Sequence, residues 1–204
     1  MTRVLVTGGA GYIGSHVCVA LIEAGYRVTV IDDFSNSYPE ALARIEQIAG
    51  EPVNLIEADL AEGSSIKSVC DGISDLAVHG AIHLAGLKAV GESVEKPALY
   101  YHTNLNSTLN LIDIMDQVGS NTIVFSSSAT VYGDGKESPL TEQVRHLEPV
   151  NPYGRTKLYN ENILRDLFAS NDSWRIINLR YFNPVAAHPS GRIGEDPRGI
   201  PNKL

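Results

Sequence analysis

The sequence predicts an α/β fold in which one parallel sheet carries helices on both faces. Three observations support this prediction: short apolar strands alternate with amphipathic helices, a glycine-rich turn follows the first strand, and an aspartate ends the second. Crossovers between parallel strands are right-handed, so the carboxyl ends of the strands meet along one edge of the sheet, where ligands bind. This is the doubly wound, Rossmann-type arrangement.

The first strand is expected at residues 4–6, a short apolar run just before the glycine-rich turn. The glycines fit both G-x-G-x-x-G and G-x-x-G-x-x-G, with members Gly8, Gly9, Gly11 and Gly14. Such spacings let the backbone approach a pyrophosphate and let the next helix pack on the strand. The N-terminus of that helix offers free N–H groups to phosphate. We therefore expect Gly8, Gly11 and Gly14 to contact a dinucleotide cofactor.

The second strand, residues 27–31, ends at Asp32, about 20 residues after Gly11. A carboxylate at this place accepts hydrogen bonds from the ribose hydroxyls of adenosine. Asp32 and Asp33 would repel a 2′-phosphate, and no Arg or Lys follows before Arg44, so NAD is favoured over NADP. A glycine pattern alone also fits a structural turn, but here the strand, the turn, the helix and the aspartate all fit a dinucleotide-binding site.

The alternation continues along the chain. Further helices are expected at residues 41–48 and 66–71, from Pro97 to Gly119 and after Pro152, and further strands at residues 53–57, 81–84, 122–125 and 175–179. The long helix after Pro97 is expected to place on its apolar side Leu99, Leu105, Leu109, Ile112 and Met115. The helix after Pro152 is expected to bury a stripe of Leu158, Ile163, Leu164, Leu167 and Phe168.

Tyr153 and Lys157 lie one helical turn apart, after Asn151 as a plausible N-cap and Pro152 at the first helical position. The spacing puts both side chains on one helix face. A lysine ammonium near a phenol stabilises the phenolate and lowers its pKa, so the tyrosine becomes a usable base. A surface Tyr and Lys on an amphipathic helix is the simpler alternative.

The same spacing occurs once more, from Tyr132 to Lys136. There the intervening residues are Gly133, Asp134 and Gly135, which indicate a turn, so the two side chains need not share a face. Only the pair beginning at Tyr153 is expected to be held by a helix.

Composition narrows the function classes. The chain has 204 residues and a net charge of −8 without a basic cluster, which disfavours nucleic-acid binding. Its two cysteines give neither metal spacing nor a disulfide framework, so no metal is expected. No apolar run reaches membrane length, and a strand at residue 3 or 4 leaves no room for a signal peptide. We therefore expect a cytoplasmic enzyme.

The motifs together resemble the extended short-chain dehydrogenase/reductase family, also known for its NAD-dependent epimerases and dehydratases. The resemblance rests on the glycine turn, a serine before the Tyr-x-x-x-Lys helix, and Tyr-Phe-Asn-Pro after the last strand. Within the family, three longer stretches resemble the UDP-glucose 4-epimerases: HLAGLKAVGES at residues 83–93, SSSATVYG at 126–133, and RYFNPVAAHPSGRIGEDPRGIPN at 180–202.

The resemblance implies interconversion of UDP-glucose and UDP-galactose by reversible oxidation at C4 with bound NAD. Tyr153 would take the proton of the sugar 4-hydroxyl, Lys157 would hold down its pKa and bind the nicotinamide ribose, and Ser128 would hydrogen-bond the reacting oxygen. The other implied cofactor-binding residues are Tyr12, Ile13, Asp32, Asn36, Asp59, Leu60, Leu84, Lys88 and Phe182. The implied substrate-binding residues are Ser128, Tyr153, Asn183 and Asn202.

Other interpretations stay open at this point. Asp59 could cap the following helix, and Asn36 sits in a turn-like Ser-Asn-Ser run. A sugar-nucleotide 4,6-dehydratase would share the base and the cofactor. That branch resembles an Asp-Glu pair where this chain has Ala129 and Thr130, which disfavours elimination of water. A non-catalytic NAD-binding fragment is the alternative from another class.

We expect residues 1–182 to form the NAD-binding domain with the catalytic Tyr/Lys helix. Residues 183–204 have loop composition, and in the family this segment leads into a smaller C-terminal substrate domain, so the chain is expected to lack most of that domain. Family resemblance also implies a homodimer through the long helices that start near Pro97 and Pro152. Departures from the family pattern are Leu84, Thr103, Ala186 and Lys203.

Overall fold

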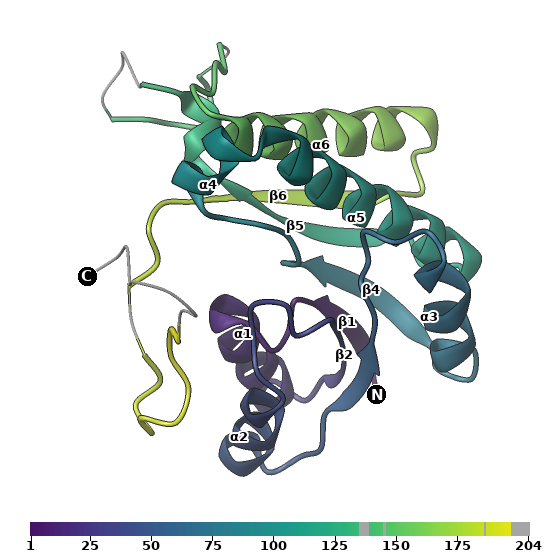
Figure 1. The fold of residues 1–204 in the computed structure, drawn as a ribbon. Helices are drawn as coiled ribbons and strands as arrows, with labels where there is room; N and C mark the ends of the chain where they lie inside the picture. The colour runs from purple at the N-terminus through teal and green to yellow at the C-terminus, as the bar shows by residue number, and fades with distance from the viewer. Residues whose placement is uncertain (135–138, 145, 186, 197–204) are drawn as a thin grey trace.

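A computed structural model describes residues 1–134, 139–144, 146–185 and 187–196. Its centre is a six-stranded, wholly parallel sheet in the order β3-β2-β1-β4-β5-β6 (Figure 1). The strands are β1 Arg3–Thr7, β2 Arg27–Asp32, β3 Asn54–Glu57, β4 Val78–His83, β5 Thr122–Ser128 and β6 Arg175–Tyr181. This order is that of a doubly wound dinucleotide-binding fold, which confirms the predicted fold class.

Helices cover both faces of the sheet. They are α1 Tyr12–Glu23, α2 Glu40–Ala49, α3 Ser65–Ile73, α4 Val90–Glu95, α5 Pro97–Gln117 and α6 Pro152–Ser170, with a 3-10 turn η1 at Ala129–Tyr132. Figure 1 shows α1 and α2 on one side of the sheet and α3, α5 and α6 on the other. The predicted helices and strands are all present, while α4 was not predicted.

Two hydrophobic cores result from the alternation of side chains along the strands. Leu5 of β1 packs into the core beneath α3, α5 and α6, together with Ile31, Leu111 and Phe125. Val6, the next residue, packs into the core beneath α1 and α2. Strand β1 therefore packs against helices on both of its faces.

The strand order reverses between β1 and β4, and this is where such folds open a ligand crevice. In the register of this pair, Thr7 lies opposite His83 at the carboxyl end. The chain leaves β4 alongside β1, because the backbone N–H of Leu84 donates to the carbonyl of Thr7 at 3.1 Å. The glycine turn and the loop after β4 thus face each other across the crevice.

The expected buried faces of the two long helices are partly wrong. On α5, Leu99 and Leu109 are 45% and 44% exposed, and on α6 Phe168 is 52% exposed. Beside apolar residues such as Leu111 and Leu164, their buried faces also carry polar ones: Asn104, Ser107 and Thr108 on α5, and Thr156, Lys157, Asn160 and Glu161 on α6. The prediction failed because apolar periodicity finds a core face only where that face is apolar.

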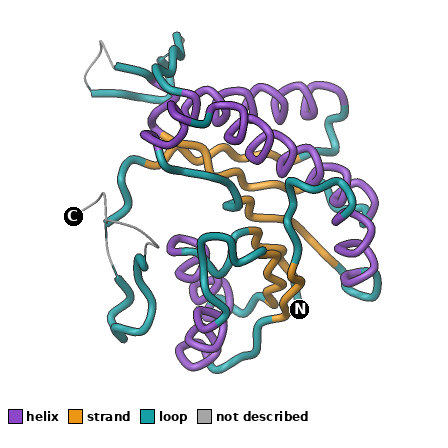
Figure 2. The backbone as a smooth tube through the Cα atoms, in the orientation of Figure 1, coloured by secondary structure: helices purple, strands orange, loops and turns teal. Residues whose placement is uncertain are grey.

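The segment after β6 has neither helix nor strand among its described residues (Figure 2). It nevertheless packs against the rest of the molecule, since Ile193 is 5% exposed and belongs to the core beneath α1 and α2. Arg192 also hydrogen-bonds to Gln47 of α2. Among the described residues, none of the helices is both long and apolar enough to cross a membrane.

Candidate active site

The glycine turn after β1 brings the backbone unusually close to neighbouring elements. Gly8 has a φ of +68°, and a Cβ there would lie 2.9 Å from the backbone nitrogen of Ala85. A Cβ on Gly14 would overlap the carbonyl oxygen of Gly8. Glycine is therefore required at both positions. Helix α1 begins at Tyr12 without a side-chain cap from Gly11, so its N-terminal N–H groups face the same edge as the crevice.

Asp32 ends β2 beside this turn and is 6% exposed. Its Oδ2 accepts from the backbone N–H of Ala10 at 2.9 Å, and its Oδ1 accepts from the N–H of Phe34 at 3.0 Å and from the Ser37 hydroxyl at 2.7 Å. These donors fix the carboxylate at the turn, in the position where the fold presents an acid to ribose. Sequence reasoning missed Ser37, although the Ser-Asn-Ser run after the acid was a signal.

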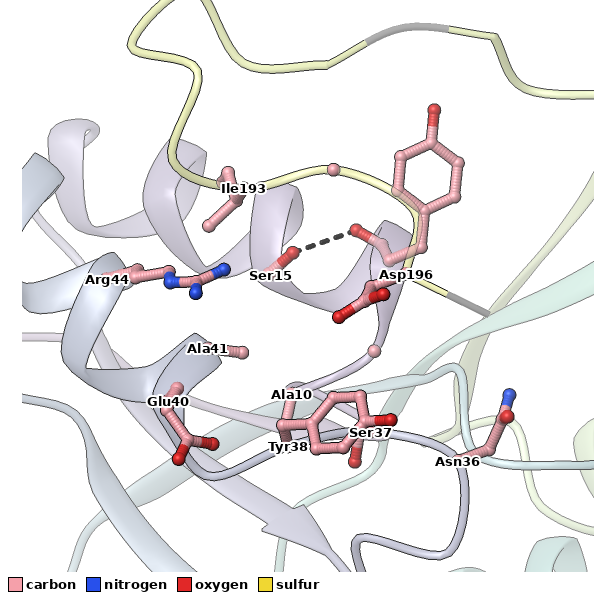
Figure 3. Close-up of a pocket in the computed structure, with 13 residues that line it drawn as sticks. Ala10, Ser15, Asn36, Ser37, Tyr38, Glu40, Ala41, Arg44, Ile193 and Asp196 are labelled. Carbon is pink, nitrogen blue, oxygen red and sulfur yellow. Dashed lines mark hydrogen bonds between the residues drawn. The ribbon is translucent and has the colours of Figure 1, made fainter. Parts of the chain in front are cut away.

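A pocket opens next to Asp32, between α1, α2 and the segment after β6. Figure 3 shows Glu40 and Arg44 of α2 on one side and Ile193 and Asp196 on the other, with Ser15 of α1 at the back. Asn36 also lines this pocket. Asn36 thus lies in a bend of the chain, as its neighbours in the sequence suggest, and also lines the pocket beside the predicted cofactor site.

The serines at the end of β5 meet α6. Lys157 is 5% exposed, and its Nζ donates to the carbonyl oxygen of Ser126 at 2.8 Å. The Ser128 hydroxyl donates toward the phenolic oxygen of Tyr153, and its Oγ accepts from Thr130 Oγ1 at 3.0 Å. The N-cap predicted for α6 is present, because the Oδ1 of Asn151 accepts from the backbone N–H of Gly154 at 2.8 Å. The structure thus brings Ser128, Tyr153 and Lys157 together.

Burial sets the protonation of this group. Desolvation raises the pKa of Tyr153, and the hydrogen bond with Ser128 offsets part of that rise. The lowering of the tyrosine pKa that the Lys157 spacing predicted is therefore not found. The ammonium points at Ser126 and lies 5.8 Å from the centre of the tyrosine ring. Burial lowers the pKa of Lys157 itself to about 8.

A buried polar chain joins β1, β4 and α5 below the site. Thr7 Oγ1 accepts from the backbone N–H groups of residues 84 and 85, so its own proton goes to His83 Nδ1 at 2.7 Å. Burial lowers the pKa of His83 to about 3, so the ring is neutral and Nε2 carries its proton. Nε2 donates to Thr108 Oγ1 at 3.1 Å, and Thr108 donates to the carbonyl of Asn104. His83 is therefore a core histidine whose two ring nitrogens both have hydrogen-bond partners.

Asn104 of α5 is the main site-supporting residue that sequence reasoning missed. Its side chain accepts from the N–H of Leu87 at 2.8 Å and donates to the carbonyl of the same residue at 3.0 Å. It also donates to Thr156 Oγ1 of α6 at 3.0 Å. The loop after β4 and the tyrosine helix are therefore held by one amide. No local pattern in the sequence marked this residue, because its partners lie 17 and 52 positions away.

The remaining predicted residues divide into three groups. Tyr12 and Ile13 open α1, and Leu84 follows β4 at the crevice. Leu60 is 4% exposed in the core, and its carbonyl oxygen accepts from the Asn110 side chain at 2.7 Å. At the exposed edge, Asp59 Oδ1 accepts from the N–H of Ala61, Lys88 pairs with Glu195 at 2.9 Å, and Phe182 and Asn183 follow β6. Ala186, Asn202 and Lys203 lie outside the described residues.

Comparisons with known proteins agree with this geometry. A family model described as the NAD dependent epimerase/dehydratase family matches residues 4–202. The chain belongs to this family. Among curated family members, the UDP-glucose 4-epimerase of Bacillus subtilis (strain 168) is 54% identical over 201 residues, which cover 98% of this chain and 58% of that protein. UDP-glucose 4-epimerase 2 of Arabidopsis thaliana is 52% identical, covering 98% of this chain and 57% of that protein.

Solved structures of family members show the same fold. The UDP-glucose 4-epimerase of Bifidobacterium longum, in complex with NAD+ and UDP, superposes with a TM-score of 0.94 at 50% identity. The Stenotrophomonas maltophila enzyme, with bound NAD and formylated UDP-arabinopyranose, gives 0.94 at 41% identity. Each comparison covers 100% of this chain and 60% of the solved one. The resemblance to UDP-glucose 4-epimerases is confirmed, and the chain spans about three fifths of their length.

Proposed function

We propose that this chain binds NAD along the crevice between β1 and β4. Three features of its own residues fit a dinucleotide: a turn too tight for any Cβ at Gly8 or Gly14, an α1 N-terminus without a capping side chain, and the Asp32 carboxylate beside them. The proposed cofactor-binding residues are Gly8, Gly11, Tyr12, Ile13, Gly14, Asp32, Asn36, Asp59, Leu60, Leu84, Lys88, Tyr153, Lys157 and Phe182. Asp32 favours NAD over NADP, because a 2′-phosphate would meet its negative charge.

The proposed activity is the interconversion of UDP-glucose and UDP-galactose. One observation carries it: Ser128 lies beside Tyr153, and the buried Lys157, one helical turn further along α6, is held by the carbonyl oxygen of the neighbouring Ser126 at 2.8 Å. NAD, when bound, supplies the acceptor and donor for a hydride at C4 of the sugar. The chain's own residues handle the proton. Tyr153 Oη takes the proton of the sugar 4-hydroxyl. It returns this proton to the 4-keto oxygen once the sugar has rotated to present its other face.

Charge explains why the tyrosine can act as a base. Because burial raises its pKa, Tyr153 holds its proton in the absence of other positive charge. Lys157 supplies one cation, and the positive charge of NAD adds a second. Ser128 donates its hydroxyl to the developing oxygen, while Lys157 retains N–H donors for the nicotinamide ribose. The proposed substrate-binding residues are Ser128, Tyr153, Asn183 and Asn202.

The test is to purify the chain, extract and identify any bound dinucleotide, and measure turnover of UDP-galactose. We expect NAD rather than NADP in the extract, and epimerisation that the Tyr153→Phe substitution lowers about 10³-fold. The matched control is Tyr159→Phe, since Tyr159 lies on the same helix with 44% of its surface exposed. A folded chain without dinucleotide would refute the cofactor site, and bound NAD without turnover would leave a cofactor-binding fragment.

A 4,6-dehydratase is less well supported. In η1, Ala129 and Thr130 occupy the positions that hold acidic residues in that branch, and Thr130 is already bound to Ser128. Neither side chain can protonate a leaving hydroxyl. The control assay is release of water from a nucleoside-diphosphate hexose, for which we expect no product.

We further propose a homodimer formed through α5 and α6. Their outer faces expose Leu99, Leu109, Tyr159 and Phe168, and the rings of Tyr101 and Tyr159 stack at 6.0 Å between the two helices. Such a shared apolar surface suits a second copy of the chain. A cytoplasmic setting is also proposed, since both cysteines are free thiols, as in reducing compartments.

A further inference from the structure

A buried ion pair lies directly behind the proposed catalytic group. Glu161 of α6, one helical turn beyond Lys157, is 1% exposed. Its carboxylate accepts two hydrogen bonds from Arg180 of β6, from Nε at 2.9 Å and from Nη2 at 2.6 Å. It also accepts from the Ser127 hydroxyl of β5 at 2.5 Å. Three elements therefore meet at one carboxylate.

Arg180 extends the contact to a fourth element. Its guanidinium lies 4.9 Å from the ring centre of Tyr132 in η1, in a cation–π contact. The pKa of Arg180 is raised, first through the hydrogen bonds with Glu161. The pair therefore joins β5, η1, α6 and β6, which surround Ser128 and Tyr153.

Stability alone is a weak reason for such a pair. Removing two charges from water costs several kcal/mol per ion, and a well-packed apolar pair of similar volume is often as stable. What an apolar pair lacks is direction, because a bidentate guanidinium–carboxylate contact fixes both partners in one geometry. The location of the pair then matters. Ser127 stands between Ser126, which receives Lys157, and Ser128, which meets Tyr153.

We propose that Glu161 and Arg180 are positioning residues that set the Ser128–Tyr153 contact by fixing Ser127 and η1 against α6. This inference rests on the proposed function and extends it to two residues that touch neither sugar nor cofactor. Ser127 directly precedes Ser128 at the end of β5, so holding its side chain on α6 fixes the stretch of backbone from which Ser128 projects. Loss of the pair allows the strand end to shift, and displacement of reacting groups by about 1 Å costs up to about 10²-fold in rate.

The main test is the Glu161→Gln substitution, which keeps the shape and removes the charge. We expect kcat to fall about tenfold to hundredfold, while KM and NAD content stay within about twofold. Glu161→Asp should recover part of the loss. The matched control is Asp71→Asn, the same chemical change in the exposed Lys67–Asp71 pair, and it should leave kcat unchanged.

A double-mutant cycle with Ser128→Ala separates positioning from general stability. If Glu161 acts through Ser128, its substitution should cost less than about threefold in the Ser128→Ala background. Full additivity, or an unchanged kcat in a folded Glu161→Gln chain, would overturn the proposal. Should the single variant fail to fold, Glu161→Gln/Arg180→Gln leaves no charge unpaired and is measured instead. If neither the single nor the double variant folds, the ion pair serves stability alone, and the positioning proposal is overturned.

A second readout needs neither cofactor nor sugar. The titration of Tyr153 is followed by tyrosinate absorbance as the difference between each chain and its Tyr153→Phe counterpart, with circular dichroism reporting the fold at each pH. The Ser128 hydrogen bond lowers the pKa of Tyr153, so Glu161→Gln should raise it in the same direction as Ser128→Ala. An unchanged titration overturns the positioning role. If the wild-type chain shows no turnover, the proposed function is refuted, but the Tyr153 titration still tests the positioning role.

Discussion

The two halves of the sheet hold their parts of the site in opposite ways. In the glycine half, residues 1–57, the packed core is largely apolar and the site is made mostly of backbone: a turn, a helix N-terminus and one carboxylate held by backbone N–H groups. In the tyrosine half, residues 78–181, α5 and α6 turn polar side chains inward, and the site is made of side chains in hydrogen-bonded chains. The first half is fixed by steric limits and the second by polar networks.

The largest effect should come from breaking the glycine half at Gly14. A Cβ in Gly14→Ala would overlap the carbonyl oxygen of Gly8 and lie 2.7 Å from Gly9 Cα, with only backbone to give way. We expect a loss of about 3 kcal/mol or more in the free energy of unfolding, together with loss of bound NAD. Urea unfolding and extraction of dinucleotide provide the two measurements.

The control for that substitution is Gly63→Ala. Nothing lies within 4 Å of a Cβ there, so its effect should stay within about 0.5 kcal/mol. Equal stability of the two alanine variants would show that the turn tolerates side chains, and the contrast between the halves would fail on the glycine side.

A smaller effect is expected from breaking the tyrosine half at Asn104. The Asn104→Ala chain leaves the N–H and carbonyl of Leu87 and the hydroxyl of Thr156 without their partner. Unsatisfied buried groups cost about 1–3 kcal/mol each, and relaxation recovers part, so we expect a loss of about 2 kcal/mol. Weaker NAD retention should accompany it, since the loop after β4 borders the crevice. Urea unfolding and the NAD content of the purified chain measure both.

Asn121→Ala is the matched control for that experiment. Asn121 donates to Ser173 at 2.8 Å near the surface, far from the crevice, so water can replace the lost bond. Its loss should remain below about 1 kcal/mol, with NAD retention unchanged. If both asparagines behave alike, the polar network does not distinguish the tyrosine half.

Much of the fold and the centre of the site followed from local sequence. The glycine turn, Asp32 and the Tyr153–Lys157 spacing each lie within a short motif whose chemistry requires those residues. The alternation of strands and helices then determined the sheet edge on which they meet. Asn151, predicted as the N-cap of the tyrosine helix, also followed from local pattern and is confirmed.

The supporting residues could not be found in that way. Asn104 contacts Leu87 17 positions earlier and Thr156 52 positions later, so no local spacing marks it. The expected face of α5 was also wrong in part, because periodicity assigned Leu109 to the core while Asn104, Ser107 and Thr108 are buried there. Helix α4, at Val90–Glu95, is too short to show a helical period.

The next prediction concerns the charge buried in the tyrosine half. Burial lowers the pKa of Lys157 from 10.5 unfolded to about 8 folded. The unfolded chain therefore binds more protons between these values, and stability contributed by this group rises with pH across that window. Between pH 8 and 9.5 the gain should be about 1.5 kcal/mol in the cofactor-free chain relative to Lys157→Met, measured by urea unfolding. A difference that is flat or falls with pH would contradict a buried, unpaired ammonium.

The smallest effect is expected for Leu109→Ala on the outer surface of the same half, with the buried Leu111 as its reference. Leu109 and Leu111 are neighbours on α5, yet Leu109 is 44% exposed and Leu111 is fully buried. Leu111→Ala should cost about 2–5 kcal/mol, whereas Leu109→Ala should cost less than about 0.5 kcal/mol when unfolding is measured on dilute protein. The proposed dimer adds a condition, because a second copy covering Leu109 would make its cost grow with protein concentration. A large cost for Leu109→Ala that is independent of concentration would place that side chain in the core and restore the face that periodicity predicted.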